Sequence, residues 1–538
     1  MSDVKNLSVL GNMEDISRSL FLLFITLFGV LLPFGNAAQA QSQVAVTTPS
    51  RSAGIHTPAP EREHRGVWMA TVLNIDYPQN PTPSAATLQA DFNSQLYRLR
   101  QAGINVIYLQ VRPAGDAIYP SALAPWSAYI SGQQGKAPVS NFDPLAYAIK
   151  TAHAQGIEVH AWVNPYRAHM STDISGLSPS HLYFRHPDWV YNYNGRMYLD
   201  PGLPEVRAHL GRVIDELLAK YDLNGIHFDD YFYPYPAPGE LVPDSLSYAR
   251  YGGGSSLEDW RRNNVNTFVT ETYRRIKQAK PWVQFSISPY GVWRNQEQDP
   301  IQGSATRASV SSYDNLYGDA LGWAKAGTVD YIIPQLYWSM EFAPASHRIL
   351  ADWWVRNTPT GVGLLVGHAA YKVGDDIDPA WKDPNEIPRQ IALARQSPRV
   401  SGSVFFSSKS LLQGPYTIRK SLNSAYKTPV LLPPRRTEVP VRPVRVKTRK
   451  PQKTSTGNSI RWEVDNDLTV EELPYYYAVY RSAEKNGPWQ LIHRSPYGQQ
   501  CHRYYFIDAF PLPETKFRYR VVPIDRFHRE MVENVLAK

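Results

Sequence analysis

The chain has 538 residues, of which 43% are hydrophobic, 12% aromatic and 19% charged. This composition supplies a large apolar core, which excludes a disordered or fibrous protein. The single cysteine, Cys501, excludes an internal disulfide framework and a cysteine-based zinc or iron–sulfur site.

The net charge of +8 is concentrated in one segment of the chain. Eight lysines and arginines and one acid, Glu438, lie between Arg435 and Lys453, so this segment alone carries +7. We interpret it as a solvated linker that offers a route to a polyanionic surface. Because the charge does not lie on an aromatic-bearing face, we expect no nucleic-acid binding.

The amino terminus has the pattern of an export signal. Basic residues precede an apolar run at 20–32, and an Ala-Gln-Ala sequence at 38–40 follows. The run is too short to span a bilayer comfortably, so we expect residues 1–40 to be a signal peptide and the protein to be exported to the periplasm, the cell envelope or the medium. An uncleaved membrane anchor is the alternative. Residues 41–61 are predicted to be a disordered lead-in.

Between residues 62 and 433, short apolar segments alternate with amphipathic helical patterns. Strands that are almost wholly apolar indicate burial on both faces, as in a parallel sheet covered by helices. Eight such units favour a (β/α)8 TIM barrel, an α/β fold, over an open sheet. The expected strands are 66–72, 106–111, 158–163, 225–228, 284–288, 331–336, 363–367 and 403–406. The expected helices are 85–102, 144–155, 204–221, 257–279, 317–326, 345–357 and 388–396.

The composition changes after residue 433. Residues 434–456 are predicted to be a basic, proline-rich linker. Residues 457–538 contain short alternating segments that predict a small all-β sandwich. The strings YAVYRS at 477–482 and YRVVPID at 519–525 resemble a fibronectin type III domain. The expected strands are 459–463, 476–482, 489–493, 504–507 and 517–522.

A barrel enzyme presents its catalytic groups at the carboxyl ends of its strands, and the fourth expected strand ends in Asp229-Asp230. Strand alternation places His227 and Asp229 inward, and we expect Asp230 at the rim or holding a neighbouring loop. An acidic turn that caps the next helix, or pairs with a loop arginine, is the structural alternative. Glycosidic bond cleavage normally takes two carboxyl groups, and we rank Glu341 and then Asp116 as the second.

Aromatic and polar residues gather at the same strand ends. Sugar rings stack on aromatic side chains, and their hydroxyls bind polar ones. No metal or cofactor is expected. The predicted substrate-binding residues are Arg112, His160, Trp162, Asn164, Tyr166, Arg167, His227, Tyr231, Tyr290, Trp293, Gln335, Tyr337, Trp338, His368 and Tyr371.

Nine blocks of sequence, including 63–72, 110–117, 160–167, 225–234, 288–295 and 334–338, closely resemble the glycosyl hydrolase-like 10 family. The resemblance runs from about residue 61 to 433. It implies a TIM barrel and glycoside hydrolysis, and it preserves Asp229 and Asp230. Members of this family include bacterial envelope hydrolases that act on peptidoglycan glycan strands stripped of their stem peptides.

We therefore expect an exported glycoside hydrolase without a cofactor that acts on a polysaccharide. The basic linker or the C-terminal domain would attach it to the cell envelope. One alternative is a carbohydrate-binding protein without catalytic activity. Another is a metal-dependent hydrolase that uses His227, Asp229 and His368.

Overall fold

The computed structural model describes residues 61–413, 418–470, 472–484, 487–509 and 516–532. The predicted signal peptide, and all but the last residue of the predicted lead-in, lie outside the described residues. Among the helices of the described ranges, none is long and apolar enough to cross a bilayer.

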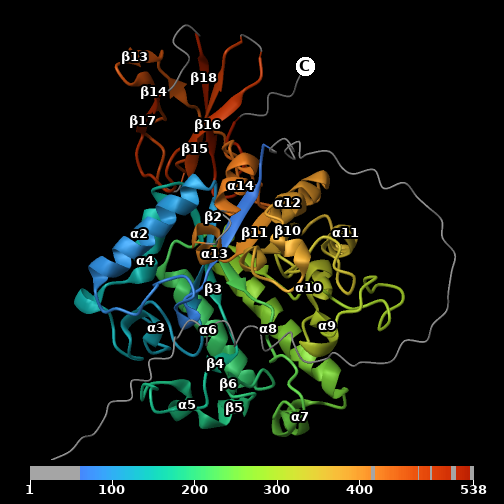
Figure 1. The fold of residues 1–538 in the computed structure, drawn as a ribbon. Helices are drawn as coiled ribbons and strands as arrows, with labels where there is room; N and C mark the ends of the chain where they lie inside the picture. Colours follow the sequence, from blue (N-terminus) through green and yellow to red (C-terminus); the bar gives the residue numbers. More distant parts are fainter. Residues whose placement is uncertain (1–60, 414–417, 471, 485–486, 510–515, 533–538) are drawn as a thin grey trace, which may run out of the picture. The chain divides into compact units, whose positions relative to one another are not determined.

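Eight parallel strands close into a barrel, in the order β1-β11-β10-β9-β8-β7-β3-β2 (Figure 1). Most barrel strands are buried along nearly their whole length, as their apolar sequences predict. The barrel part of the predicted fold is therefore confirmed. The strands are β1 (His64–Met69), β2 (Val106–Arg112), β3 (Glu158–Val163), β7 (Gly225–Phe228), β8 (Gln284–Ile287), β9 (Tyr331–Ile332), β10 (Gly363–Ala369) and β11 (Val400–Phe406).

Helices surround these strands (Figure 1). Side chains cap several helix starts: Ser84 accepts a hydrogen bond from the Thr87 amide at the start of α2, and Asp143 accepts one from Ala146 at the start of α4. Such caps satisfy amides that have no partner within the helix. The longer helices are α2 (Ala85–Gln101), α4 (Pro144–His153), α6 (Pro204–Lys220), α8 (Leu257–Ala279), α11 (His347–Asn357) and α12 (Glu386–Gln396). The shorter ones are α3 (Ala128–Ser131), α5 (Leu182–Arg185), α7 (Ser245–Tyr251), α9 (Ser312–Asn315), α10 (Ala320–Ala326), α13 (Ser408–Gln413) and α14 (Ile418–Ala425).

Strand β9 is much shorter than predicted. It ends at Ile332, whereas the sequence pattern extends to residue 336. Pro334 has no amide hydrogen to donate, so it interrupts the ladder. Pairing resumes only as single bridges from Gln335 to Tyr290 and to Gly367, and these bring the Gln335 segment to the carboxyl ends of β8 and β10.

A small antiparallel sheet in the loop after β3 was not predicted. It contains β4 (Arg167–His169), β6 (Arg196–Leu199) and β5 (Val190–Tyr193), in the order β4-β6-β5. Asn194 and Gly195 join β5 to β6 with positive φ values of 47° and 69°. This Asn-Gly turn is a strong hairpin signal. The sheet begins at Arg167 and so fixes that residue beside the end of β3.

The C-terminal region contains two antiparallel sheets. In the first, β14 (Gly457–Glu463) pairs with β12 (Lys447–Thr448), β13 (Gln452–Thr454) and β17 (Arg503–Asp508). In the second, β15 (Tyr476–Ser482) lies between β16 (Gln490–Arg494) and β18 (Arg518–Ile524). Trp462 and Tyr504 of one sheet pack in one buried cluster with Tyr477 and Val521 of the other, which confirms the predicted sandwich.

The segment 434–456 is not the free linker that its composition predicts. It contains β12 and β13, and each of these strands pairs with β14 of the C-terminal domain. Lys447 forms an ion pair with Asp465 at 2.6 Å and Arg449 one with Glu463 at 3.2 Å. The basic run is thus largely part of the C-terminal domain.

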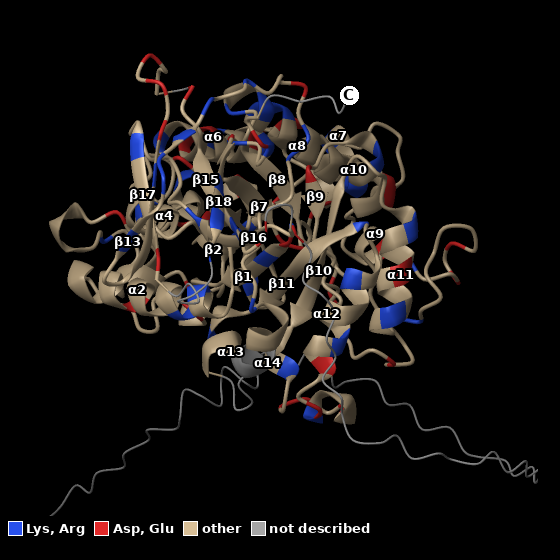
Figure 2. Ribbon diagram, turned by 90° about the horizontal axis from the view of Figure 1, so that it is seen from above, with Lys and Arg blue, Asp and Glu red and all other residues tan. Residues whose placement is uncertain are grey.

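On the barrel, charges of both signs lie along α11 and α12 (Figure 2).

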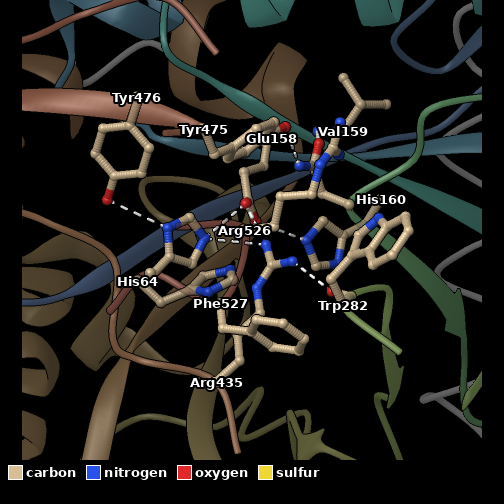
Figure 3. Close-up of polar contacts among 12 residues, drawn as sticks. His64, Glu158, Val159, His160, Trp282, Arg435, Tyr475, Tyr476, Arg526 and Phe527 are labelled. Carbon is tan, nitrogen blue, oxygen red and sulfur yellow. Dashed lines mark hydrogen bonds and ion pairs between the residues drawn. The ribbon is translucent and has the colours of Figure 1, made fainter. Parts of the chain in front are cut away.

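Glu158, the first residue of β3, joins the barrel to the C-terminal region (Figure 3). Its buried carboxylate accepts hydrogen bonds from Arg435, from His528 at 2.8 Å and from His160 at 3.1 Å. Arg435 also donates to the Trp282 carbonyl at 2.5 Å. The contact lies where barrel strands begin, at the opposite end from the residues that follow β7.

Candidate active site

The end of β7 places the Asp229-Asp230 pair. Strand alternation directs His227 into the barrel, where the indole of Trp68 donates a hydrogen bond to it at 3.0 Å. Phe228 points outward and stacks on Phe268 of α8 at 5.4 Å between ring centroids. The strand ends at Phe228, so alternation no longer constrains the two aspartates that follow.

Asp229 is buried, with 5% of its surface exposed. The side-chain amide of Asn164 donates a hydrogen bond to its Oδ2, and its Oδ1 accepts none from the described residues. Burial raises the pKa of Asp229 to about 7, and the charge of Asp230 adds to this effect while Arg167 opposes it. Asp229 therefore holds its proton up to near-neutral pH.

The alternation argument predicted Asp230 at the rim. In the structure Asp230 is instead as deeply buried as Asp229. The hydroxyl of Tyr235 donates a hydrogen bond to its Oδ2. Burial raises the pKa of Asp230, and the hydrogen bond from Tyr235 counteracts this. Two neighbouring buried carboxyl groups do not both ionise readily, and the charge of Asp230 accordingly raises the pKa of Asp229.

A chain of side-chain amides orients Asp229. Gln110 of β2 accepts hydrogen bonds at its Oε1 from the backbone amides of Thr71 and Val72, both at 2.9 Å. Its Nε2 donates to Oδ1 of Asn164 at 2.6 Å. This bond fixes the Asn164 amide with its N–H group toward Asp229. Gln110 was not among the predicted site residues, and its only sequence signal is a polar residue inside an apolar strand.

Arg167 brings a positive charge to the pair. Its guanidinium lies over the ring of Tyr231, 4.6 Å from the centroid, and its Nη1 donates to the Pro113 carbonyl at 3.0 Å. Its charge lowers the pKa of Asp229 and of Asp230. Arg167 therefore stabilises an ionised carboxylate in the pair.

Half-buried aromatic side chains surround the carboxyl groups. Tyr290 is linked to Tyr235 at 6.2 Å and to Trp338 at 5.5 Å between ring centroids. Tyr337 contacts Tyr371 at 6.2 Å. Burial, with the charge of Asp230 as a further cause, raises the pKa of Tyr290 and of Tyr337, which places both near the pair. We call these side chains the aromatic cluster. It comprises Tyr231, Tyr235, Tyr290, Tyr337, Trp338 and Tyr371.

Two further predicted residues, Gln335 and Trp162, lie close to the aspartates. Gln335 lowers the pKa of Asp230 through its side chain, and its Nε2 donates to the Ser288 carbonyl at 2.9 Å. Trp162 is buried in β3 and lowers the pKa of Asp229. The structure thus gathers residues that follow β3, β7, β8 and β9. Tyr235 was not predicted, although Tyr231, Tyr233 and Tyr235 form an alternating run after the pair.

Three predicted histidines are buried and have protein partners rather than lying at the site. His160 contacts Glu158 and Tyr331, and His368 contacts Gln390 and Ser403 through its two ring nitrogens. His227 uses both nitrogens on Trp68, Ser286 and Ser288. The side chains of His160 and His227 point into the barrel, whereas that of His368 faces α11 and α12, where it contacts His347 and Gln390. Burial lowers the pKa of all three, so they are neutral.

The residues of the metal-hydrolase alternative are not brought together as a ligand set. Both nitrogens of His227 and of His368 have protein partners. Across the described ranges, no group of three or more His, Cys, Asp or Glu side chains has an arrangement that could hold a metal ion.

Three other predicted binding residues support the fold around the site. Tyr166 is buried against Phe268, and Trp293 donates to Asp319 at 3.1 Å. Arg112 is also buried, and its Nη1 donates to the carbonyl of Asn164 at 3.3 Å. Arg112 therefore acts on the site through the backbone that carries Asn164.

The structure brings neither proposed second carboxylate to the pair. The side chain of Glu341 is 72% exposed and forms an ion pair with Arg348 at 2.9 Å. Asp116 is buried, accepts a hydrogen bond from Gln134 at 3.3 Å and has Arg112 as a charged neighbour. The carboxyl group that neighbours Asp229 is that of Asp230, whose charge raises the pKa of Asp229.

Comparisons with known proteins show which family the chain is similar to. The family described as "Glycosyl hydrolase-like 10" matches residues 63–383. "Glycosyl hydrolase YngK" of Bacillus subtilis (strain 168) is 41% identical over 527 residues, covering 96% of this chain and 97% of the relative. "Glycosyl hydrolase DigH" of Escherichia coli (strain K12) is 38% identical over 365 residues, covering 64% of this chain and 82% of the relative.

Among solved structures, the PgaB (BpsB) glycoside hydrolase domain from Bordetella bronchiseptica aligns with a TM-score of 0.44 and 14% identity, over 69% of this chain and 99% of that one. The family match covers more than half of the chain, and the Bacillus relative is similar over nearly all of it. The chain therefore belongs to the glycosyl hydrolase-like 10 family and is a glycoside hydrolase.

Proposed function

We propose that this enzyme is exported and cleaves O-glycosidic bonds in the glycan strands of peptidoglycan, with Asp229 and Asp230 as its catalytic residues. The observation that carries the proposal is a pair of buried carboxyl groups, with raised pKa values, beside the aromatic cluster. Carboxyl groups supply the acid and the anionic partner of glycoside hydrolysis. Aromatic faces supply sugar-stacking surfaces.

The two aspartates take different roles because their surroundings differ. Asp229, with a pKa of about 7, donates its proton to the glycosidic oxygen as the bond to the anomeric carbon breaks. Tyr235 favours the ionised form of Asp230, whose charge stabilises the positive charge that develops on the sugar. Water then adds to the anomeric carbon and returns a proton to Asp229, which restores the enzyme.

The substrate part of the proposal is tested with purified wild-type enzyme and three polymers: peptide-free peptidoglycan glycan, intact peptidoglycan and cellulose. Released reducing ends and product masses are measured with and without a chelator, and glycan binding is measured separately. We expect cleavage of the peptide-free glycan, unaffected by the chelator. Binding without released ends would favour the carbohydrate-binding alternative, and loss of activity with the chelator would favour the metal-dependent one.

Export is tested by expressing the full chain and sequencing the amino terminus of the mature protein. Cleavage after residue 40, with the protein found outside the cytoplasm, is the expected result. A cytoplasmic protein with an intact amino terminus would contradict this part of the proposal and leave the glycosidase chemistry untouched.

A further inference from the structure

A cavity of about 370 Å³ lies near the amino ends of the barrel strands. Its lining includes Arg65 at the start of β1, Arg100 near the end of α2 and Gln155 after α4. Lys427, after α14, and Arg494, the last residue of β16, complete its polar wall. The barrel and the C-terminal domain both contribute, and none of these residues belongs to the site around Asp229.

The lining of this cavity is strongly positive. It contains three arginines and one lysine, and no aspartate or glutamate. Arg65 forms an ion pair with Glu63 through its Nε at 2.7 Å. Arg100, Lys427 and Arg494 form no ion pair with any residue in the described ranges, so their charge is not balanced by neighbouring acids.

Two guanidinium groups in this lining carry buried nitrogen atoms that donate no hydrogen bond. Nη2 of Arg65 and Nη1 of Arg494 have no partner among the described residues. Arg65 is 1% exposed, so water does not reach most of its surface. A buried charged donor without an acceptor is costly. An acceptor bound in the cavity beside these two guanidinium groups would offset part of this cost.

The same positive charges affect the pKa of the neighbouring His493. Burial lowers its pKa to about 4, and the charges of Arg100 and Arg494 contribute. His493 is therefore neutral at physiological pH and leaves the guanidinium groups as the cationic part of the wall. The two arginines come from the barrel and from the C-terminal domain, respectively.

We propose that this cavity binds a small, multiply charged oxyanion, a phosphate or carboxylate compound, between the barrel and the C-terminal domain. Arginine forks match the oxygen geometry of both groups and form strong charge-assisted hydrogen bonds with them. The cavity volume is in the range of small-molecule sites. Because the cavity lies at the strand ends opposite Asp229, the proposal is independent of the glycan that the enzyme cleaves.

The test is isothermal titration calorimetry of the full-length protein with inorganic pyrophosphate and with citrate, at constant ionic strength set by chloride. We expect saturable binding of one equivalent of at least one anion. Pyrophosphate alone would identify a phosphate site, citrate alone a carboxylate site, and both a general oxyanion site. Arg100→Gln and Arg494→Gln are each expected to weaken binding by about tenfold, since each removes a charged hydrogen-bond donor.

The matched control is Arg503→Gln, because Arg503 lies exposed on β17 and outside the cavity. This variant is expected to bind as the wild type does. Glycan hydrolysis should be unchanged in all three variants, which shows that they fold. The proposal is overturned if neither anion binds at millimolar concentration, or if Arg503→Gln weakens binding as much as the two cavity variants do.

Discussion

At the scale of single residues, the chemistry of the site depends on where one proton resides. Burial raises the pKa of Asp229, and the hydrogen bond from Asn164 lowers it. A general acid must be protonated, so kcat/KM should fall as pH rises through about 7, the pKa of Asp229. Gln110 and Asn164 control this limb of the profile without donating a proton to the substrate themselves.

Replacing Asn164 with alanine removes an N–H donor that favours ionised Asp229. We therefore expect the alkaline limb of the pH profile of kcat/KM to move to higher pH. Activity at the optimum should fall about tenfold, because the carboxyl group loses its orientation. The measurement is kcat/KM from pH 5 to 9. The control, Asn192→Ala, changes an exposed residue of β5 and should leave the profile unchanged. Loss of activity in Asn164→Ala without movement of the limb would show a purely structural role.

The sequence predicts some of these residues for good physical reasons. Asp229, Asp230, Asn164 and Arg167 are polar groups directly after apolar strands, where a barrel presents its site. The depth of a side chain inside the barrel has no such signal, so the inward-facing His160 was predicted at the site although it lies in the core.

At the scale of elements, close backbone packing determines where the aspartates lie. A Cβ atom at Gly225, the first residue of β7, would lie 2.1 Å from the ring of His160. That ring is held by hydrogen bonds to Glu158 and Tyr331, so it has little freedom to move away. Only glycine fits between β7 and β3 at this position.

Gly225→Ala is therefore expected to destabilise the enzyme by about 2–4 kcal/mol, as overpacking in a rigid core does. Activity should also fall, because β7 carries Asp229 and Asp230. The free energy of unfolding is measured by urea titration. Gly176→Ala is the matched control: its Cβ would meet no atom within 4 Å, and it should change stability by less than about 0.5 kcal/mol. Equal stability of the two variants would contradict this account of the packing.

Hydrophobic periodicity predicts seven of the eight barrel strands closely because their burial pattern is continuous. It fails at β9, where Pro334 ends the ladder inside an apolar run. It also misses β4, β5 and β6, whose alternation is short and lies inside a loop. These strands depend on pairing with one another rather than on burial in the barrel.

At the scale of the whole molecule, Glu158 couples the barrel to the C-terminal domain. Although burial alone would raise it, the positive charge of Arg435 and the hydrogen bond from His528 hold the pKa of Glu158 well below its usual range. The ionised carboxylate therefore stabilises the folded state above the unfolded-state pKa of about 4.3, and this stabilisation is lost as pH falls toward the lower folded-state value.

Glu158→Gln leaves Arg435 buried without a counter-charge and should lower the free energy of unfolding by about 3–5 kcal/mol at pH 7. In calorimetry we expect one unfolding transition for the wild type and separate transitions of the two domains for the variant. Glu463→Gln, which removes a surface pair with Arg449, is the control and should cost less than about 1 kcal/mol. A variant that keeps a single transition with wild-type Tm would contradict the coupling.

The contact between Glu158 and Arg435 was not predictable from composition, because the basic run has the composition of a solvated linker. Arg435 differs from its neighbours only in having a buried acid within reach. That acid, Glu158, opens an apolar strand more than two hundred residues earlier in the chain. Long-range partners of this kind leave no local pattern.

The central claim, that Asp229 and Asp230 together cleave the glycan, is tested most directly by kcat/KM of Asp229→Asn and Asp230→Asn on the cleaved substrate. Each variant keeps a side chain of similar size but cannot supply the proton or the charge, so we predict a fall of about 10²–10⁴-fold in each. Glu341→Gln, at the exposed acid, should retain wild-type activity. Wild-type kcat/KM in either aspartate variant, or a comparable loss in Glu341→Gln, would contradict the claim.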